Sequence, residues 1–491
     1  MKRFTSFPIL RLNTVPAVVS FLSMTILAIL LPSCTYNWPQ FRGPDADMVP
    51  EARHLPQTWG EEENIRWTTA VEGESWTSPI IWGNRVFYAA AVPVKVAPEP
   101  ERPPSPPPTA RRDNTAAEGQ QPDGPTPGPP GQPPPGTPGQ PPPQPEEQQA
   151  YLDDIYRWEV TCLDLETGEE LWKQVAVEGS PREKKHRATN YASETPVTDG
   201  KRLFVYFGNT GLYCYSLEGE LLWDKDLGAF ETLRDWGTGS SPVLHRGLLC
   251  VQVDNEAQSF VAALDASTGE EVWRAEREEG TNYSTPVIWK NRSRTELVVG
   301  GKTARSYDPE TGELLWQLEV PGYYNMPSPV ADRDHLYLGN TAFRDTPGSM
   351  ICVRAGASGD ITPPEGDTTS SGVVWMHRDI STGNPSPLLY EGYLYLLSSR
   401  GGDLTCLDAA TGAIVYEERA TRVGACWASP WAYEGRIYFI DENGVTSVVE
   451  AGPEFELLHQ NTLDDKFWAS PAFASDAMIL KGVEKMYCVG E

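Results

Sequence analysis

The sequence lacks the short motifs that usually mark a catalytic centre. It contains no HExxH zinc motif, no GxSxG nucleophile elbow, no P-loop and no CxxC pair. Histidine is scarce, and the six histidines show no metal-ligand spacing: His54, His186, His245, His335, His377 and His459. We therefore expect no catalytic residues and no bound metal, and we interpret the histidines as structural or surface residues.

The eight cysteines show no sign of pairing. Five of them occupy one repeated position, two residues before the Asp of a recurring turn or its equivalent: Cys162, Cys214, Cys352, Cys406 and Cys488. Equivalent positions of different repeats lie too far apart for a disulfide, and nothing pairs Cys250 with Cys426. We expect small packing residues here, even in an exported chain.

Positive charge is also scarce, since 40 Lys and Arg face 68 Asp and Glu, for a net charge of -28. The first 34 residues carry Lys2, Arg3 and Arg11 and no acidic residue, so their removal would take the charge to -31. Such a balance argues against nucleic acid and anionic lipid headgroups as partners of the main body.

What the sequence has in quantity is a repeat. Eight Ser-Pro or Thr-Pro pairs each precede a short apolar run, and their prolines are Pro79, Pro196, Pro242, Pro286, Pro329, Pro387, Pro430 and Pro471. After a first gap of 117 residues, successive prolines lie 46, 44, 43, 58, 43 and 41 residues apart. This is the period of a four-stranded propeller blade. The predicted fold class is all-β, an eight-bladed β-propeller of four-stranded antiparallel blades.

A second element of the repeat is an acidic Thr-Gly turn that ends in an aromatic residue. It occurs at residues 163–172, 264–273, 307–316 and 407–416, with a shortened copy at 217–223. Asp and Thr-Gly supply the side-chain acceptor and the positive-φ residue of a tight hairpin, and the Trp can pack between neighbouring blades. The blade after Pro329 carries a longer hairpin, 354–372, before Trp375.

The two ends of the chain predict how the ring closes. Only 20 residues follow Pro471, so the last blade lacks an outer strand and its Trp. Residues 64–71, with Trp67, supply both. We expect eight blades with the termini sharing the last one. Seven blades is the alternative, if the blade at 426–459, which lacks the Trp turn, collapses.

Outside the repeat we expect three segments. Residues 1–34 have a basic start and an uncharged apolar run, 15–31, which predict a lipoprotein-type signal with lipid attachment at Cys34; simple secretion or retention as an anchor are alternatives. Residues 35–63 form an N-terminal extended segment before the propeller at 64–491. Residues 93–149 hold 21 of the 45 prolines and predict a disordered or polyproline tether between the second and third strands of the first blade.

Binding residues are expected on the face that carries the loops before each inner strand. Three positions before marker prolines lie Trp76, Tyr283, Met326, Trp427 and Trp468, which predict an aromatic funnel at the channel mouth, with mutual packing as the alternative. Loops of the same face carry Asn190, Tyr191 and Trp236. The basic loop 179–194 predicts an anion site at Arg182, Lys184, Lys185 and Arg187, with a solvated loop as the alternative.

The Trp turns resemble the tryptophan-docking repeats of the quinoprotein (pyrroloquinoline quinone, PQQ) eight-bladed propellers, and the opening NWPQFRGPDAD, 37–47, resembles exported PQQ-like propeller proteins of planctomycetes. The resemblance implies the fold. Quinoprotein alcohol dehydrogenases place two adjacent cysteines against the cofactor, and no two cysteines are adjacent here. The BamB family, lipoprotein scaffolds of outer-membrane protein assembly without enzymatic activity, is similar in its Trp turns and blade number.

We therefore expect a monomeric, lipid-anchored propeller of the cell envelope, at the outer membrane or in the periplasm. It would bind an envelope protein or a polysaccharide on its loop face, without turnover or cofactor. One alternative is an alcohol or sugar oxidoreductase that depends on PQQ with calcium. A further alternative is a BamB-like assembly factor for outer-membrane proteins.

Overall fold

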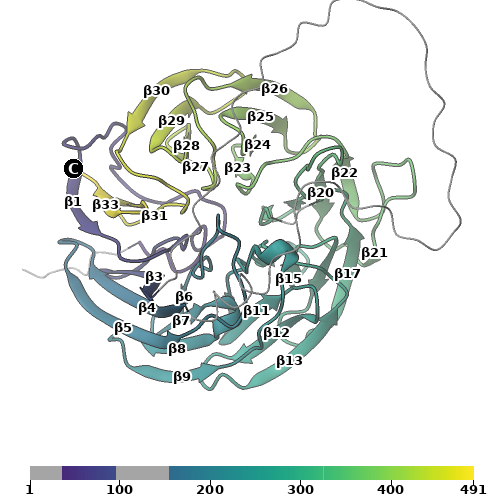
Figure 1. The fold of residues 1–491 in the computed structure, drawn as a ribbon. Helices are drawn as coiled ribbons and strands as arrows, with labels where there is room; N and C mark the ends of the chain where they lie inside the picture. Colours follow the sequence, from purple (N-terminus) through teal and green to yellow (C-terminus); the bar gives the residue numbers. More distant parts are fainter. Residues whose placement is uncertain (1–35, 96–153, 324–325) are drawn as a thin grey trace, which may run out of the picture. The chain divides into compact units, whose positions relative to one another are not determined.

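The apolar run after each Ser-Pro or Thr-Pro marker forms a short inner strand. In the computed structural model, which describes residues 36–95, 154–323 and 326–491, eight such strands surround the central axis of one ring (Figure 1). Each inner strand begins a four-stranded antiparallel sheet, and one sheet gains a fifth strand. The prediction of an all-β, eight-bladed propeller is confirmed. The signal at 1–34 and its Cys34 lie outside the described residues.

The blades are numbered along the chain, and each is given from its inner to its outer strand. Blade 1 comprises β2 (Ile80–Trp82), β3 (Arg85–Lys95), β4 (Ile155–Asp164) and β5 (Glu170–Gly179), and blade 2 comprises β6 (Val197–Thr198), β7 (Arg202–Tyr206), β8 (Leu212–Ser216) and β9 (Leu221–Lys225). Blade 3 comprises β10 (Val243–His245), β11 (Leu248–Val253), β12 (Ser259–Asp265) and β13 (Glu271–Arg277). Blade 4 comprises β14 (Val287–Lys290), β15 (Thr295–Val299), β16 (Thr303–Tyr307) and β17 (Leu314–Glu319).

Blades 5 to 8 follow the same order. Blade 5 comprises β18 (Val330–Ala331), β19 (His335–Leu338), β20 (Met350–Arg354) and β22 (Val373–His377), and blade 6 comprises β23 (Leu388–Tyr390), β24 (Tyr393–Leu397), β25 (Asp403–Asp408) and β26 (Ile414–Arg419). Blade 7 comprises β27 (Trp431–Tyr433), β28 (Arg436–Ile440), β29 (Val445–Glu450) and β30 (Leu457–Thr462). Blade 8 comprises β31 (Ala472–Phe473), β32 (Met478–Lys481), β33 (Lys485–Val489) and β1 (Ile65–Ala70). Two single-turn 3₁₀ helices lie at Gly208–Thr210 and Leu233–Asp235.

The ring closes as the sequence predicts, because β1 is the outer strand of blade 8. It pairs antiparallel with β33, and Trp67 lies opposite Cys488. The alternative of seven blades is wrong, since β27 to β30 form a complete sheet. In that blade His459 occupies the place of the docking Trp, opposite Val448.

Five docking Trp residues of the described chain join their blade to the next one by an indole hydrogen bond, whereas Trp316 donates to Glu296 of its own blade. Trp172, for example, lies opposite the small Cys162 on β4, and its indole N–H donates to the carbonyl of Leu217 in blade 2 at 3.0 Å. The turn glycine of blade 2, Gly219, has a φ of 89°, and a Cβ there would lie 2.8 Å from the Trp172 ring. Glycine is therefore needed both for the turn and for the ring stacked on it. Trp67, Trp223, Trp273 and Trp375 donate in the same way to the next blade.

The cysteines of the described residues are all free and buried: Cys162, Cys214, Cys250, Cys352, Cys406, Cys426 and Cys488. Burial raises the pKa of each of these thiols to about 12. The expectation of packing residues rather than disulfides is confirmed for these seven.

Two segments depart from the repeat, the long hairpin of blade 5 and the Pro-rich insert of blade 1. The long hairpin of blade 5 contains β21 (Gly359–Asp360), which adds in parallel to β17 and covers the outer edge of blade 4. The Pro-rich insert does leave blade 1 between β3 and β4, but its predicted start at residue 93 is wrong. Pro93 pairs with Tyr156 and Lys95 with Ile155, so β3 continues to Lys95. The predicted disorder of the remainder lies outside the described residues.

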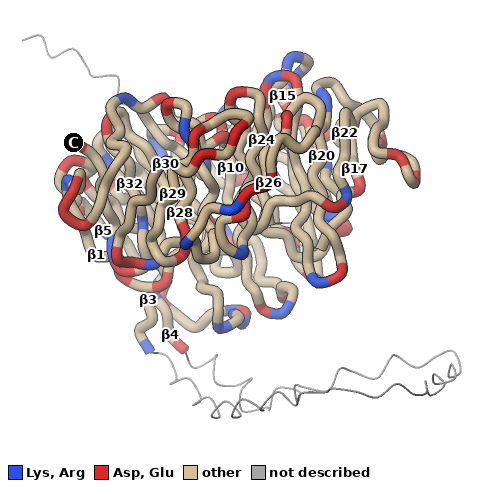
Figure 2. The backbone as a smooth tube through the Cα atoms, turned by 90° about the horizontal axis from the view of Figure 1, so that it is seen from above, with Lys and Arg blue, Asp and Glu red and all other residues tan. Residues whose placement is uncertain are grey.

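The extended segment at 35–63 is described from Tyr36 onward and packs onto the ring. Trp38 exchanges two backbone hydrogen bonds with Ile81, at 2.9 and 2.8 Å, and the Pro39 carbonyl accepts from the Thr198 N–H. We call residues 36–50 the N-terminal plug. Charged residues gather at the turns and loops along both edges of the ring (Figure 2). No helix within 36–95, 154–323 or 326–491 has the length and apolarity to cross a membrane.

Candidate functional site

The Ser or Thr of each marker belongs to a closed circle of hydrogen bonds around the channel. Each backbone N–H donates to the marker hydroxyl of the following blade. The eight bonds are Ser78 to Thr195 (3.1 Å), Thr195 to Ser241 (2.9 Å), Ser241 to Thr285 (3.0 Å), Thr285 to Ser328 (2.9 Å), Ser328 to Ser386 (3.0 Å), Ser386 to Ser429 (3.3 Å), Ser429 to Ser470 (2.9 Å) and Ser470 to Ser78 (3.1 Å). We call these eight residues the hydroxyl circle.

The hydroxyl circle explains the chemistry of the marker. Its members are all buried, with no more than 5% of any residue exposed, so their backbone N–H groups need partners inside the protein. The next residue is always proline, which brings no N–H of its own to the start of the inner strand. A hydroxyl followed by proline therefore satisfies the backbone N–H donors at this level of the channel.

A cavity of about 120 Å³ lies within the hydroxyl circle and opens on the loop face. Trp76, Tyr283, Met326, Trp427 and Trp468 all line it, so the structure brings together the five residues of the predicted funnel. Ser193, Gly239 and Asn384 occupy the same position in the other blades. We call this cavity and its rim the channel mouth.

Aromatic side chains of the channel mouth contact one another and also reach solvent. The rings of Trp76 and Trp468 lie edge to face, with centroids 5.0 Å apart. Trp427 is 40% exposed, and its indole N–H donates to Glu442 at 3.2 Å. Trp76 and Trp468 therefore pack against each other, as the alternative prediction of mutual packing has it. Trp427 instead presents an apolar face to solvent.

Among the residues that the structure describes, no Asp, Glu, His, Cys, Lys or Arg lines the channel mouth. General acid–base and nucleophilic catalysis both need such groups at the reacting atoms. The arrangement is suited to binding through apolar faces and neutral hydrogen-bonding groups.

The floor of the channel mouth is Phe41 of the N-terminal plug. The next residue, Arg42, is wholly buried, and its guanidinium donates to the carbonyls of Ser328 (3.3 Å), Pro329 (2.8 Å) and Pro387 (2.9 Å). Burial lowers the pKa of Arg42 to about 10. Gly43 has a φ of 87° and lies against the Trp38 ring, where a Cβ would have no room. The motif NWPQFRGP therefore fixes the plug in the channel.

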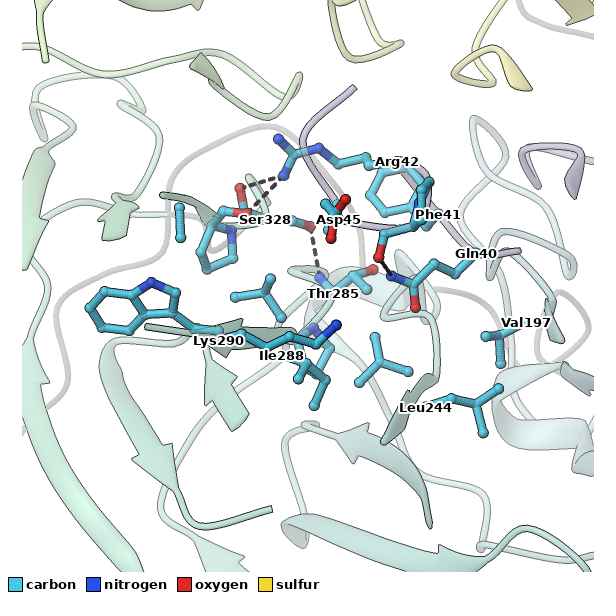
Figure 3. A pocket seen from close by; sticks show the side chains of 18 of the residues that line it. Gln40, Phe41, Arg42, Asp45, Val197, Leu244, Thr285, Ile288, Lys290 and Ser328 are labelled. Atoms are coloured by element: carbon cyan, nitrogen blue, oxygen red, sulfur yellow. Dashed lines mark hydrogen bonds between the residues drawn. The ribbon is translucent and has the colours of Figure 1, made fainter. Parts of the chain in front are cut away.

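A second cavity, of about 370 Å³, lies on the other side of the plug. Figure 3 shows Gln40, Phe41, Arg42 and Asp45 on one side of it, and Val197, Leu244 and Ile288 of the inner strands on the other. Sequence reasoning missed this cavity, because its plug wall comes from a segment without the repeat. The motif at 37–47 was the available signal, but it indicated only a resemblance.

The other predicted residues of the loop face do not line the channel mouth. Tyr191 packs against Tyr156 and Trp158, and its carbonyl accepts from the Trp158 indole at 3.1 Å. Asn190 is buried, and its side-chain oxygen accepts from the Ala192 N–H. Trp236 stacks on His186, with centroids 4.1 Å apart.

The basic loop is largely engaged with acidic neighbours. Arg182 pairs with Asp226 at 2.7 Å, and Lys185 pairs with Glu74 at 2.8 Å. Arg187 is exposed and Lys184 is half-buried. The pairs leave less free charge than the sequence suggests, and anion binding by Arg182, Lys184, Lys185 and Arg187 stays a prediction.

Glu194 and Lys481 are buried ionisable groups near the loop face. Burial raises the pKa of Glu194, next to Thr195, to about 7. Burial lowers the pKa of Lys481 to about 7, and its ammonium donates to the Ser75 carbonyl at 2.8 Å. Neither lines the channel mouth.

The residues of the channel mouth do not fit PQQ with calcium. PQQ is an anionic quinone with three carboxyl groups, and the described part of the chain places no cationic side chain in the lining of this cavity to bind them. A calcium ion needs several oxygen ligands, mostly carboxylates, and the described residues contain no group of three or more His, Cys, Asp or Glu arranged for a metal. That the chain needs no cofactor stays a prediction, with PQQ and calcium as the alternative.

Comparison with known proteins agrees with this architecture. The family described as outer membrane protein assembly factor BamB matches residues 157–356 and 230–391. No curated protein matches the chain. Among solved structures, the quinohemoprotein alcohol dehydrogenase of Comamonas testosteroni is 10% identical, with a TM-score of 0.54, over 93% of this chain and 81% of that one. The quinohemoprotein alcohol dehydrogenase ADHIIG of Pseudomonas putida is 10% identical, with a TM-score of 0.51, over 92% and 80%.

A structure of BamB from Moraxella catarrhalis is 11% identical over 69% of this chain and 91% of that one, with a TM-score of 0.49. At such identities the likeness of the two dehydrogenases to this chain concerns the fold. The family match and the eight blades show an eight-bladed β-propeller whose repeats, over residues 157–391, are similar to those of the BamB family.

Proposed function

We propose that the protein is a non-catalytic scaffold of the cell envelope, which binds an envelope protein or a polysaccharide on its loop face around the channel mouth. The observation that carries this proposal is the lining of the channel mouth, which combines aromatic and hydroxyl groups and, within residues 36–95, 154–323 and 326–491, includes no acidic, basic or thiol side chain. Such a surface offers apolar area and hydrogen bonds but no group for turnover.

The N-terminal plug supports the choice of face. Phe41 forms the floor of the cavity and Arg42 holds the plug through three carbonyls, so a partner of the channel mouth would reach it from the loop side. The exposed face of Trp427 provides the kind of aromatic anchor that dominates many interfaces.

The proposal includes a location and an attachment. A lipid on Cys34 would tether a monomeric propeller to the membrane, and Thr35 after this cysteine favours the outer membrane over retention at the inner one. Periplasmic release is the alternative. The family match to an assembly factor favours a second candidate, a role in outer-membrane protein assembly. Deletion of the gene followed by an unchanged outer-membrane protein profile would contradict this second candidate.

Site-specific photo-cross-linking in the native envelope tests the proposed face. A photoreactive phenylalanine analogue replaces Trp427 in one strain and Leu171 in another. Leu171 is the matched control, because it is 49% exposed but lies on the outer strand β5. We expect a discrete cross-linked product from position 427 and none from position 171. Equal products from both positions, or products from 171 alone, would contradict a binding role for the loop face.

A further inference from the structure

The hydroxyl circle has unused hydrogen-bonding capacity. Each of its eight oxygens accepts one backbone N–H, yet none of its hydroxyls donates to another group of the described residues. The eight residues all line the channel mouth and are at least nine-tenths buried. Eight hydroxyl protons therefore converge on one small cavity, where they need acceptor atoms from water or from a ligand.

The eight hydroxyl donors restrict the chemical groups with which a ligand can fill the cavity. A protonated amine has no acceptor and would leave the hydroxyl protons unsatisfied. A carboxylate or phosphate would accept them, but none of the described residues that line the cavity is cationic, and the whole chain carries a net charge of -28. A neutral group rich in oxygen atoms satisfies both conditions.

The rim adds an apolar requirement. Trp76 and Trp468 meet edge to face, and Trp427 leaves its ring 40% exposed. Aromatic faces bind apolar C–H surface, so a ligand of this site should combine an apolar face with oxygen atoms on its edge. A pyranose ring has both. The cavity of about 120 Å³ exceeds by several-fold the roughly 30 Å³ share of one water in the liquid, so it can take more than a single solvent molecule.

We propose that the channel mouth binds the terminal, uncharged sugar of a glycan, which stacks on the Trp rim and accepts hydrogen bonds from the hydroxyl circle. The site is a blind pocket, because Phe41 closes its floor, so the glycan enters by its end and does not thread through the ring. The proposal rests on the proposed binding role of the loop face and gives that role a ligand class.

Saturation-transfer NMR and titration calorimetry on the purified protein test the site. The probes are cellohexaose, chitohexaose and mannohexaose, with hexagalacturonate as the acidic counterpart of matched length. We expect at least one neutral hexamer to bind, with saturation transfer strongest at its terminal residue, and hexagalacturonate to bind at least tenfold more weakly. Absence of binding by all three neutral hexamers, or tighter binding of the acidic one, overturns the proposal.

Three variants distinguish a loss of sugar binding at the cavity from a general effect on the folded protein. Trp427→Ala should weaken the binding of the neutral hexamer at least tenfold, and Trp427→Phe should restore most of it. Tyr323→Ala is the matched control, because Tyr323 is an aromatic residue of similar exposure, 41%, that does not line the cavity. Tyr323→Ala should bind normally. Binding that Trp427→Ala leaves unchanged, or that Tyr323→Ala weakens equally, overturns the proposal.

The result is distinguishable from failure of the proposed function. If no sugar binds but position 427 still cross-links to an envelope protein, the glycan site is refuted and the scaffold role stands. If neither is observed, both are refuted.

Discussion

The backbone N–H of Ser470 donates to the hydroxyl of Ser78 at 3.1 Å, across 392 residues of sequence. This bond joins blade 8 to blade 1 and completes the hydroxyl circle. β1 joins the same two blades at the outside of the ring, where Trp67 donates to the Leu165 carbonyl at 2.8 Å. Closure therefore depends on an inner contact between Ser470 and Ser78 and on an outer contact between Trp67 and Leu165.

Substitution within the hydroxyl circle should destabilise the whole ring. Thr285→Val keeps the shape of the side chain but removes the acceptor of the Ser241 N–H. An unsatisfied buried donor costs about 1–3 kcal/mol in the free energy of unfolding. Urea denaturation followed by tryptophan fluorescence measures it. Thr285→Ser keeps the hydroxyl and should cost clearly less; equal losses in the two variants would show that the hydrogen bond is unimportant.

Truncation of the closing Trp should open the ring. Trp67 is buried against Gly168 of the neighbouring turn, and Trp67→Ala removes both the ring and its hydrogen bond. The expected loss is about 3–5 kcal/mol. Trp427→Ala, at a half-exposed position, is the control and should change stability by no more than about 0.5 kcal/mol. A loss in Trp67→Ala no larger than in this control would contradict the described closure.

Removal of the buried guanidinium should release the N-terminal plug. Arg42→Met leaves the carbonyls of Ser328, Pro329 and Pro387 without their charged donor, at a cost of about 3 kcal/mol. Limited proteolysis should then cleave within residues 36–50 faster than in the parent protein. Arg85→Met, which breaks a surface pair with Glu218, should cost no more than about 1 kcal/mol and leave cleavage unchanged. A protected plug in Arg42→Met would refute the anchoring role.

Stability should rise with pH above neutrality because of Lys481. Burial lowers the pKa of this lysine from 10.5 to about 7, against a smaller opposing effect of Asp465. Between these values the unfolded chain binds a proton that the folded chain does not, so raising the pH favours the folded state. We expect a gain of about 1 kcal/mol or more between pH 7 and pH 9. Lys481→Met should flatten this rise, and an equally steep rise in that variant would assign the effect to other groups.

The repeat made the ring predictable. The marker prolines recur mostly every 41–46 residues, and a docking Trp stands at the same place of most blades, so local strand and turn chemistry sufficed to place the blades, Trp67 and the closing strand. The same register placed Trp76, Tyr283, Met326, Trp427 and Trp468 around the channel, because equivalent positions of a ring face one axis. The sequence therefore predicted the rim of the candidate site as well as the fold.

The features that could not be predicted from the sequence are contacts and loops that do not follow the repeat. The partners of Arg42 are backbone carbonyls more than 280 residues away, which no local pattern encodes. Asn190, Tyr191 and Trp236 lie in irregular loops, whose path depends on packing such as that of Tyr191 on Trp158. The residues of the hydroxyl circle are the Ser and Thr of the marker pairs, so the repeat pattern identified them. Each of their hydrogen bonds joins two different repeats, so the pattern did not identify their partners.

In its proposed scaffold role, the propeller binds a partner at the channel mouth without a quinone cofactor. Calorimetric titration of the protein with PQQ in the presence of calcium tests it most directly. The uncharged lining of the channel mouth predicts no saturable heat and no shift in Tm. Saturable binding at micromolar or lower Kd, abolished by substitution of Trp76, Trp427 or Trp468, would contradict the scaffold role and indicate a quinoprotein oxidoreductase.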